Sequence, residues 1–139
     1  TLFDCVIKSP DKSFYSFPYS YKPETRAKTH PKQENFNPDF LLKRAGRNEI
    51  LVVEIKKDDD DNYKNRAKYR DGIKHFQTLN ARLIEKNIAW TYLFYFLSEA
   101  NYTDFFQVVK ENKHAGWKSG LMVELEQEAV RAQEIIING

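Results

Sequence analysis

Three charged side chains stand out because their types and spacing suit phosphodiester hydrolysis. Glu54 and Lys56 are two residues apart at the end of an apolar run that begins at Ile50. Side chains at i and i+2 of a strand point to the same face, so we expect this carboxylate and this amine to lie side by side. Asp39 precedes a second apolar stretch, which starts at Phe40. If the two stretches pair, the sequence predicts two carboxylates and a lysine at one sheet edge.

Such a group of side chains fits metal-dependent cleavage of a phosphodiester bond. A divalent cation neutralises charge on the phosphate and lowers the pKa of a bound water. Mg²⁺ prefers a few carboxylates and keeps its other positions for water and phosphate oxygens. Asp39 and Glu54 would supply the carboxylates, and the main-chain carbonyl of Ile55 is a natural third ligand. Lys56 would orient the attacking water or stabilise charge, and Mg²⁺ or Mn²⁺ is the expected cofactor.

Composition places the chain among small soluble domains. Its 139 residues match one domain, and 41% apolar with 30% charged residues excludes a disordered or membrane-embedded chain. No apolar run approaches the ~20 residues that span a bilayer, so no membrane partner is expected. The single cysteine, Cys5, excludes an internal disulfide framework and fits a reducing, cytoplasmic compartment. The chain starts at Thr1 and soon reaches an apolar pair, which suggests a piece of a longer polypeptide.

Apolar periodicity predicts the elements that would position these residues. The expected strands cover 13–21, 36–43, 49–57 and 88–97, with a polar loop or hairpin over 22–35 and a turn over 45–49, and the expected helices cover 63–86, 98–109 and 121–137. The short turn makes its two flanking strands antiparallel. The helix between strands 49–57 and 88–97 implies a right-handed crossover and a parallel pair. We therefore expect an α/β fold, one domain over residues 1–139, with a mixed β-sheet flanked by helices.

Pro38-Asp39 followed by Glu54-Ile55-Lys56, set in strands and followed by a helix, resembles the PD-(D/E)xK nuclease superfamily. The resemblance covers roughly residues 14–97. It includes the runs 35–40, 51–56, 65–69 and 75–76, which look like the nuclease domain attached to type III-like restriction subunits and related superfamily 2 helicases. It implies a restriction-endonuclease-like fold and a Mg²⁺-dependent endonuclease acting on DNA. It also implies a restriction-modification or defence enzyme whose parent chain carries a helicase motor domain.

The chain departs from the family in one respect. The superfamily usually adds an acidic residue from a helix ahead of the first core strand, and little of the chain precedes Ser13. Glu24 and Glu34 are substitutes by residue type alone. In a straight strand Glu34 would face away from Asp39, five residues later.

The helix after the third strand often carries a polar residue aimed at the site in this family. Lys68, Tyr69 and Gln77 are the candidates for that supporting role. Core packing is the alternative for Tyr69.

Basic residues gather in two segments that could contact a phosphate backbone. They are Arg26, Lys28 and Lys32 in the polar loop, and Lys64, Arg66 and Lys68 at the start of the long helix. Contacts of this kind give salt-sensitive, sequence-independent binding to DNA. Plain solubility is the alternative, because such runs often form a solvated face. The sequence carries no base-reading motif.

Two functions remain open at this point. The first is a metal-dependent endonuclease domain that hydrolyses DNA. The second is a catalytically inactive nuclease-fold module that binds nucleic acid or mediates assembly within a helicase. A purely structural alternative makes Asp39 a turn cap and Glu54–Lys56 a surface ion pair worth under ~1 kcal/mol. A carboxylate at the end of an apolar strand is costly to bury without a partner, which favours the site.

Overall fold

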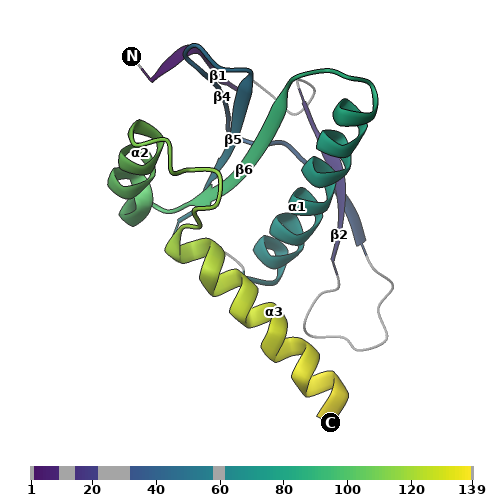
Figure 1. Cartoon of the computed structure of the whole chain (residues 1–139). Coiled ribbons are helices and arrows are strands. Elements are labelled where there is room, and N and C mark those ends of the chain that lie inside the picture. Colours follow the sequence, from purple (N-terminus) through teal and green to yellow (C-terminus); the bar gives the residue numbers. More distant parts are fainter. Residues whose placement is uncertain (1, 10–14, 22–31, 58–61, 139) are drawn as a thin grey trace.

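The computed structural model of the chain describes residues 2–9, 15–21, 32–57 and 62–138 (Figure 1). The strands are β1 (Phe3–Lys8), β2 (Phe17–Tyr21), β3 (Lys32–Phe36), β4 (Phe40–Arg44), β5 (Glu49–Ile55) and β6 (Thr91–Leu97). The helices are α1 (Asn62–Glu85), α2 (Tyr102–Lys110) and α3 (Gly120–Asn138), with a short 3₁₀ turn at Glu99–Asn101. The chain is therefore a mixed α/β protein, as its periodicity predicts.

The main sheet has the strand order β1-β4-β5-β6. Strands β4 and β5 form an antiparallel hairpin, and Gly46 in its turn has φ +70°, a conformation that glycine adopts without steric cost. Strands β5 and β6 are parallel and are connected through α1. Both pairings confirm the directions predicted from the loop lengths.

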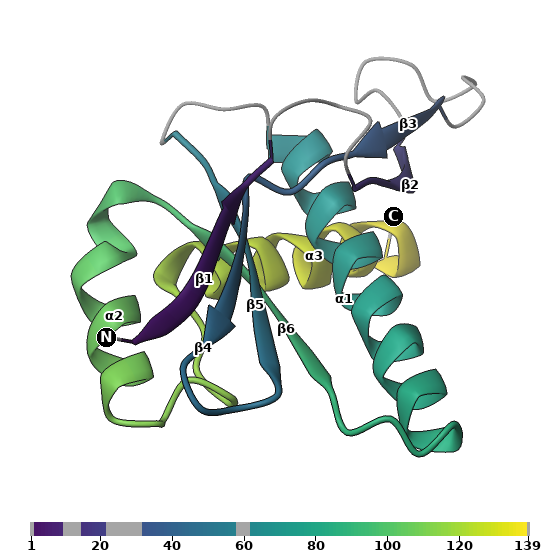
Figure 2. The same ribbon diagram turned by 90° about the horizontal axis from the view of Figure 1, so that it is seen from above.

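Helices cover both faces of this sheet (Figure 2). Helix α2 lies on the face to which Val53 and Ile55 point, where Phe105 closes the core. Helix α1 lies on the opposite face, where the Tyr69 ring packs against Phe94 and Phe96. Strand β5 is buried from Leu51 to Glu54, so it is the central strand between the two helical layers.

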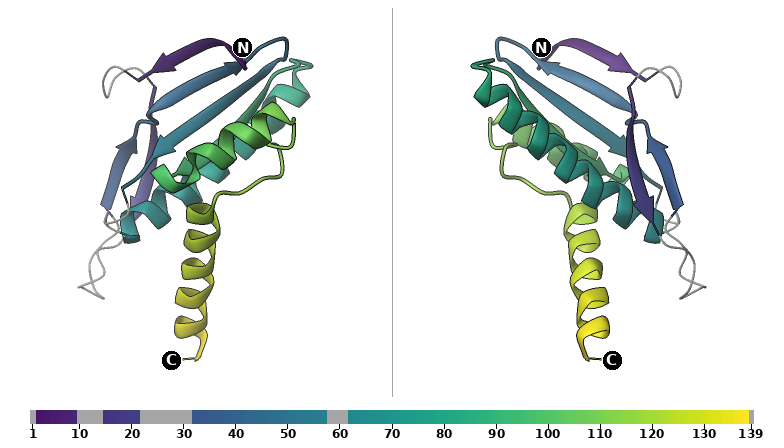
Figure 3. Two further views of the ribbon diagram at one scale, coloured as in Figure 1. Left: turned by 90° about the vertical axis from the view of Figure 1, so that its left-hand side faces the viewer. Right: turned by 90° about the vertical axis from the view of Figure 1, so that its right-hand side faces the viewer.

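Strands β2 and β3 form a separate antiparallel ribbon that lies against α1. Its inward aromatic residues, Phe17, Tyr19 and Phe36, join the main core. Helix α3 packs against α1 and β6 near its start and then projects away from the sheet (Figure 3). None of the helices in the described residues is both long enough and apolar enough to cross a bilayer.

Two strands fall outside the elements expected from the sequence. Strand β1 is largely exposed, so it lacks the apolar alternation that marks a half-buried strand. Strand β3 lies within the stretch expected as a loop or hairpin, and only Phe36 in it is buried. Its polar side chains hide a segment held mainly by backbone pairing to β2. The strand expected over 36–43 is thus interrupted at residues 37–39.

Candidate active site

Asp39 and Glu54 lie together at one end of the main sheet. In the β4–β5 hairpin Phe40 is opposite Val53, so the residue before β4 lies beside the end of β5. The Ile55 N–H donates a hydrogen bond to Asp39 Oδ2 at 2.8 Å. The strand pairing on which the predicted site depends is therefore present. Because the N–H and C=O of one strand residue point to the same side, the Ile55 carbonyl faces the Asp39 side as well.

Glu54 and Lys56 form a buried ion pair. Lys56 Nζ lies 3.1 Å from Glu54 Oε2, and the two side chains are only 11% and 7% exposed. The two side chains lie side by side, as their spacing predicts. The alternative of a surface ion pair is wrong in its location, because both side chains are almost completely buried. Burial makes each partner costly to leave unpaired.

The Glu54 carboxyl has an altered affinity for protons. Burial raises its pKa from 4.5 to about 7, the Lys56 ammonium opposes that change, and the nearby Asp39 carboxylate adds to it. Glu54 Oε1 is buried and has no hydrogen-bond donor within the described residues. Asp39 can bond to Glu54 only when one of the two acids carries a proton. The site therefore holds two carboxylates closer together than their charges favour.

Lys68 of α1 is the second cation at the site. Its ammonium lies 5.6 Å from the centre of the Tyr19 ring and 5.5 Å from that of Phe36. Burial lowers its pKa, the Lys56 ammonium lowers it further, and the Glu54 carboxylate raises it. Lys68 thus belongs to the same electrostatic cluster as Glu54 and Lys56.

Glu34 of β3 is also closer to this cluster than a straight strand would allow. The chain turns between β3 and β4, so the alternation that would point Glu34 away from Asp39 does not continue through residues 37–39. Glu34 accepts hydrogen bonds from the Tyr19 and Tyr21 hydroxyls, both at 2.8 Å. These bonds lower its pKa, and the Lys64 and Lys68 charges lower it further. The sequence offers Glu34 as a substitute by residue type alone, because the β2–β3 pairing that positions it leaves no signal in the spacing of residues.

The donor atoms suit a divalent cation in part. Glu54 Oε1 is an orphaned buried acceptor, and Asp39 together with the Ile55 carbonyl would add oxygen ligands from the adjacent strand end. Carboxylate, carbonyl and water oxygens are what Mg²⁺ and Mn²⁺ prefer. Across the described ranges no group of three or more His, Cys, Asp or Glu side chains is placed to hold a metal ion. The remaining coordination positions would therefore fall to water and substrate.

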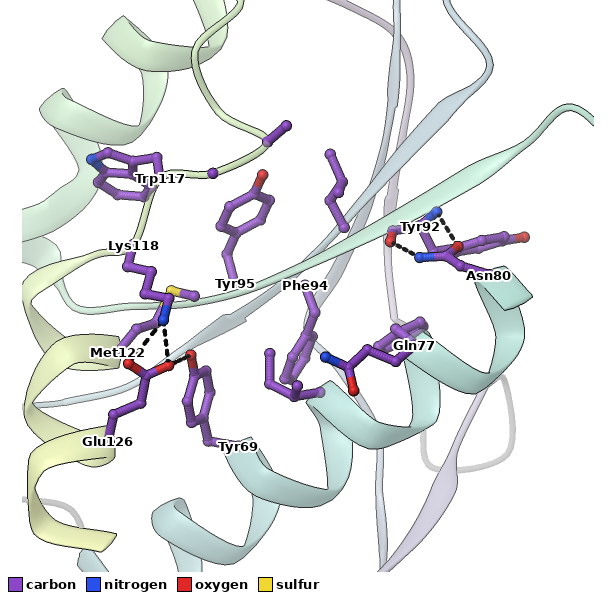
Figure 4. A pocket seen from close by; sticks show the side chains of 15 residues that line it. Tyr69, Gln77, Asn80, Tyr92, Phe94, Tyr95, Trp117, Lys118, Met122 and Glu126 are labelled. Atoms are coloured by element: carbon purple, nitrogen blue, oxygen red, sulfur yellow. Dashed lines mark hydrogen bonds and ion pairs between the residues drawn. The ribbon is translucent and has the colours of Figure 1, made fainter. Parts of the chain in front are cut away.

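Tyr69 and Gln77 do not join the cluster. The Tyr69 hydroxyl donates to Glu126 of α3 at 2.9 Å, and its ring is part of the core, which is the alternative considered for it. Gln77 is exposed and lines a cavity of about 400 Å³ between α1, β6 and α3 (Figure 4). Successive side chains of a helix are about 100° apart around its axis, so Lys68 and Tyr69 face different neighbours. Lys68 is the α1 residue that the structure brings to the site.

The basic residues proposed to contact DNA have different surroundings. Arg26 and Lys28 lie outside the described residues, and Lys32 is exposed at the start of β3. Lys64 lies 3.9 Å from Glu34 and 5.1 Å from the Tyr21 ring centre. Arg66 is half-buried, and Lys68 is directed to the carboxylate cluster described above. Lys64 and Lys68 thus connect the start of α1 to the candidate site.

Histidine takes no part in this cluster within the described residues. His75 Nε2 shares a hydrogen bond with the Tyr15 hydroxyl at 2.8 Å, and its ring stacks on Phe17. His114 is buried near the other end of β5 and lies 2.9 Å from Glu49 Oε1. Both are structural residues that fix the ribbon and the loop before α3.

Comparisons with protein-family models, with curated proteins and with solved structures found no match for this chain. The candidate site consists of two carboxylates, a main-chain carbonyl and two ammonium groups at one end of a mixed sheet.

Proposed function

We propose that this chain is a metal-dependent endonuclease domain that hydrolyses DNA phosphodiester bonds, with a restriction-endonuclease-like fold. One observation carries the proposal: Asp39 and Glu54 lie together, and Lys56 is 3.1 Å from Glu54 at the same strand end. The pKa of the buried Glu54 carboxyl is raised by burial and by the nearby Asp39 carboxylate, and a bound cation would stabilise its charged form. The resemblance of these residues to the PD-(D/E)xK pattern supports the same function.

Each residue has a defined role in the proposed mechanism. Asp39, Glu54 and the Ile55 carbonyl would hold Mg²⁺ or Mn²⁺, which when bound supplies Lewis acidity and a water of lowered pKa. Lys56 would orient the attacking water and stabilise negative charge that develops on the phosphate. Lys68, which shares the electrostatic field of Lys56 and Glu54, would attract the phosphodiester to this end of the sheet.

DNA as the substrate, and a helicase motor and restriction role for the parent protein, rest on the resemblance. The exposed Lys32 and the Lys64 side chain near the site support contact with a phosphate backbone. Such contacts would make binding fall steeply with salt concentration and would not select a base sequence.

A second function is favoured by a specific observation. Within the described residues no group of three or more His, Cys, Asp or Glu side chains is placed to hold a metal ion, and Lys56 is already paired with Glu54. An inactive nuclease-fold module that binds nucleic acid would retain such an ion pair for stability. It would not cleave DNA.

Plasmid nicking separates the two functions. We expect the protein to nick supercoiled plasmid with Mg²⁺ or Mn²⁺, and to lose this activity with EDTA or with Lys56→Ala. Lys110→Ala is the matched control, because Lys110 is exposed on α2, away from the site. Nicking that persists in EDTA or in Lys56→Ala would refute the proposed site. Salt-dependent DNA binding without nicking under any metal would establish the inactive module instead.

A further inference from the structure

The outer edge of β6 is covered by side chains at two positions and open at the position between them. The Leu97 C=O accepts a hydrogen bond from the Lys56 N–H at 2.8 Å, so the odd-numbered residues of β6 direct their peptide groups to the β5 side. The even-numbered residues Tyr92, Phe94 and Phe96 therefore direct theirs away from the sheet. An edge of this kind offers N–H and C=O groups to a partner.

Side chains from the neighbouring helices occupy two of these three positions. The Asn80 carboxamide of α1 accepts from the Tyr92 N–H and donates to the Tyr92 C=O, both at 2.8 Å (Figure 4). The hydroxyl of Ser119, the residue before α3, donates to the Phe96 C=O at 2.6 Å. Within the described residues no group bonds to the outward N–H or C=O of Phe94. Because both neighbouring positions are covered, a further strand has no place along β6, and only a small group can reach the Phe94 peptide.

Phe94 borders a cavity that is large enough for such a group. This edge cavity, of about 400 Å³, lies between α1, β6, the segment 115–118 and the start of α3, and Phe94 is one of its lining residues. Cavities of this size that are lined by aromatic rings and a few polar groups hold small organic ligands. The unpaired peptide groups of Phe94 keep their full hydrogen-bonding capacity for a ligand in this cavity.

Asn80 shows which chemical group suits the Phe94 peptide. The N–H and C=O of Tyr92 lie side by side on the edge, and a single carboxamide satisfies both of them. Phe94 presents the same two groups two residues farther along the strand, about 6.6 Å away. A second carboxamide, or a ring lactam in which N–H and C=O are likewise adjacent, would therefore bond to Phe94 in the same manner.

Aromatic rings on both sides of the edge favour a planar ring over an open-chain amide. The Tyr69 ring packs on the α1 side of β6, whereas the Tyr95 and Trp117 rings lie on the other side, and all three border the cavity (Figure 4). A ligand bonded to the edge continues the plane of the sheet, as a paired strand would, and therefore lies between these two groups of rings. Flat heterocycles stack well in such a position. The Gln77 carboxamide, also at the cavity, is available for a second carbonyl of the ligand.

We propose that the edge cavity binds a planar heterocycle with a lactam edge, the chemistry of the thymine and uracil bases, through paired hydrogen bonds to the N–H and C=O of Phe94. The lactam N–H donates to the Phe94 carbonyl, and a lactam carbonyl accepts from the Phe94 N–H. This base edge is available in a free nucleoside and in an unpaired base of a single strand. The inference concerns a cavity apart from the Asp39–Glu54 cluster and does not depend on the proposed nuclease function.

Amide NMR spectra test the site at the peptide that defines it. When ¹⁵N-labelled protein is titrated with thymidine to about 10 mM, the Phe94 amide signal should move with a dissociation constant of about 1 mM or below, as expected for a ligand of this size. The Tyr92 amide signal should move less, because Asn80 already bonds to that peptide. N3-methylthymidine lacks the lactam N–H and should bind about tenfold more weakly. An unmoved Phe94 signal, or equal affinity for the two nucleosides, would overturn the proposal.

A pair of tryptophan variants tests the cavity itself. Gln77→Trp places a large ring at the cavity and should abolish thymidine binding, whereas Thr78→Trp, at the next position of α1 and outside the cavity lining, should leave binding unchanged. Equal affinity of the two variants for thymidine would place the nucleoside elsewhere and refute the site. A short thymidine oligomer distinguishes the two sources of the base. Tighter, salt-dependent binding that moves the Phe94 signal identifies an unpaired strand, and binding no tighter than that of thymidine identifies the free nucleoside.

Discussion

Replacing Glu54 by glutamine should stabilise the metal-free protein at pH values above neutrality. The folded state raises the pKa of this carboxyl from 4.5 to about 7, chiefly because Glu54 is buried. A group that binds its proton more tightly in the folded state contributes most to stability below its unfolded pKa. That contribution is lost as the pH rises from 4.5 to about 7. Glutamine cannot ionise and therefore keeps the state that the fold prefers.

The shift sets the size of the effect. At roughly 1.36 kcal/mol per pKa unit, the rise corresponds to about 3 kcal/mol of lost stability once Glu54 is fully ionised. Glutamine leaves the Lys56 ammonium without its charged partner at 3.1 Å, which reduces the gain. We expect a net increase in unfolding free energy of about 1–3 kcal/mol at about pH 8, and little change at about pH 4.

Urea unfolding in EDTA at these two pH values measures the effect directly. Glu124→Gln is the matched control, because Glu124 is exposed on α3 and the same substitution there should leave stability unchanged at both pH values. An equal gain at both pH values, or no gain above neutrality, would show that the fold does not penalise the charged Glu54. The reasoning about the carboxylate pair would then be refuted.

The same experiment with Mg²⁺ connects stability to the proposed metal site. A cation bound only by the folded state at a hundred times its dissociation constant adds about 2.7 kcal/mol. The wild-type protein should gain stability from Mg²⁺ at about pH 8, whereas Glu54→Gln should gain much less because it lacks a ligand oxygen. Equal gains in the two proteins would place the cation elsewhere.

Two further predictions concern the packing that positions the site. Gly72→Ala should destabilise the protein by about 1–3 kcal/mol, because an added Cβ would lie 2.4 Å from the Phe94 ring. Gly116→Ala is the control, because an added Cβ there has no atom within 4 Å, and a similar urea midpoint for the two variants would contradict this packing. Asn80→Ala should lower the free energy of unfolding by about 1–3 kcal/mol, because the Tyr92 N–H and C=O lose their hydrogen bonds to the Asn80 side chain. An unchanged urea midpoint would show that water replaces these bonds without loss of stability.

Local sequence pattern was sufficient for the part of the fold that holds the candidate site. The apolar run before Glu54 predicts a central strand, and the short turn after β4 predicts the hairpin that places Asp39 beside it. The helical spacing over α1 then implies the parallel β5–β6 pair. These features depend on neighbours in the sequence, which is why periodicity and loop length reveal them.

Other features depend on contacts between distant segments. Strand β1 is an exposed edge and β3 is mostly polar, so neither shows the apolar alternation by which strands are detected. The position of Lys68 in the cluster follows from how α1 lies on the sheet, and that of Glu34 from the pairing of β3 with β2. Sequence spacing alone could not distinguish Lys68 from Tyr69 as the residue directed to the site.

The charge balance of the cluster explains how one set of residues would serve both the metal-free and the proposed catalytic state. Asp39 and Glu54 carry two negative charges when ionised, and Lys56 and Lys68 carry two positive charges, so the ionised cluster is neutral. In this state the lysines offset part of the repulsion between the carboxylates, and Glu54 still binds a proton near neutral pH.

A divalent cation held by both carboxylates would replace that proton and leave a net positive site. Positive charge in a partly buried site attracts an anionic phosphodiester and stabilises the additional negative charge of its transition state. Lys68→Met should therefore weaken DNA binding in the presence of Ca²⁺ more than in EDTA, measured by fluorescence anisotropy, because the positive charge of the site is greater with the cation bound. Equal weakening in both conditions would show that Lys68 acts as an ordinary phosphate contact, independent of the carboxylates.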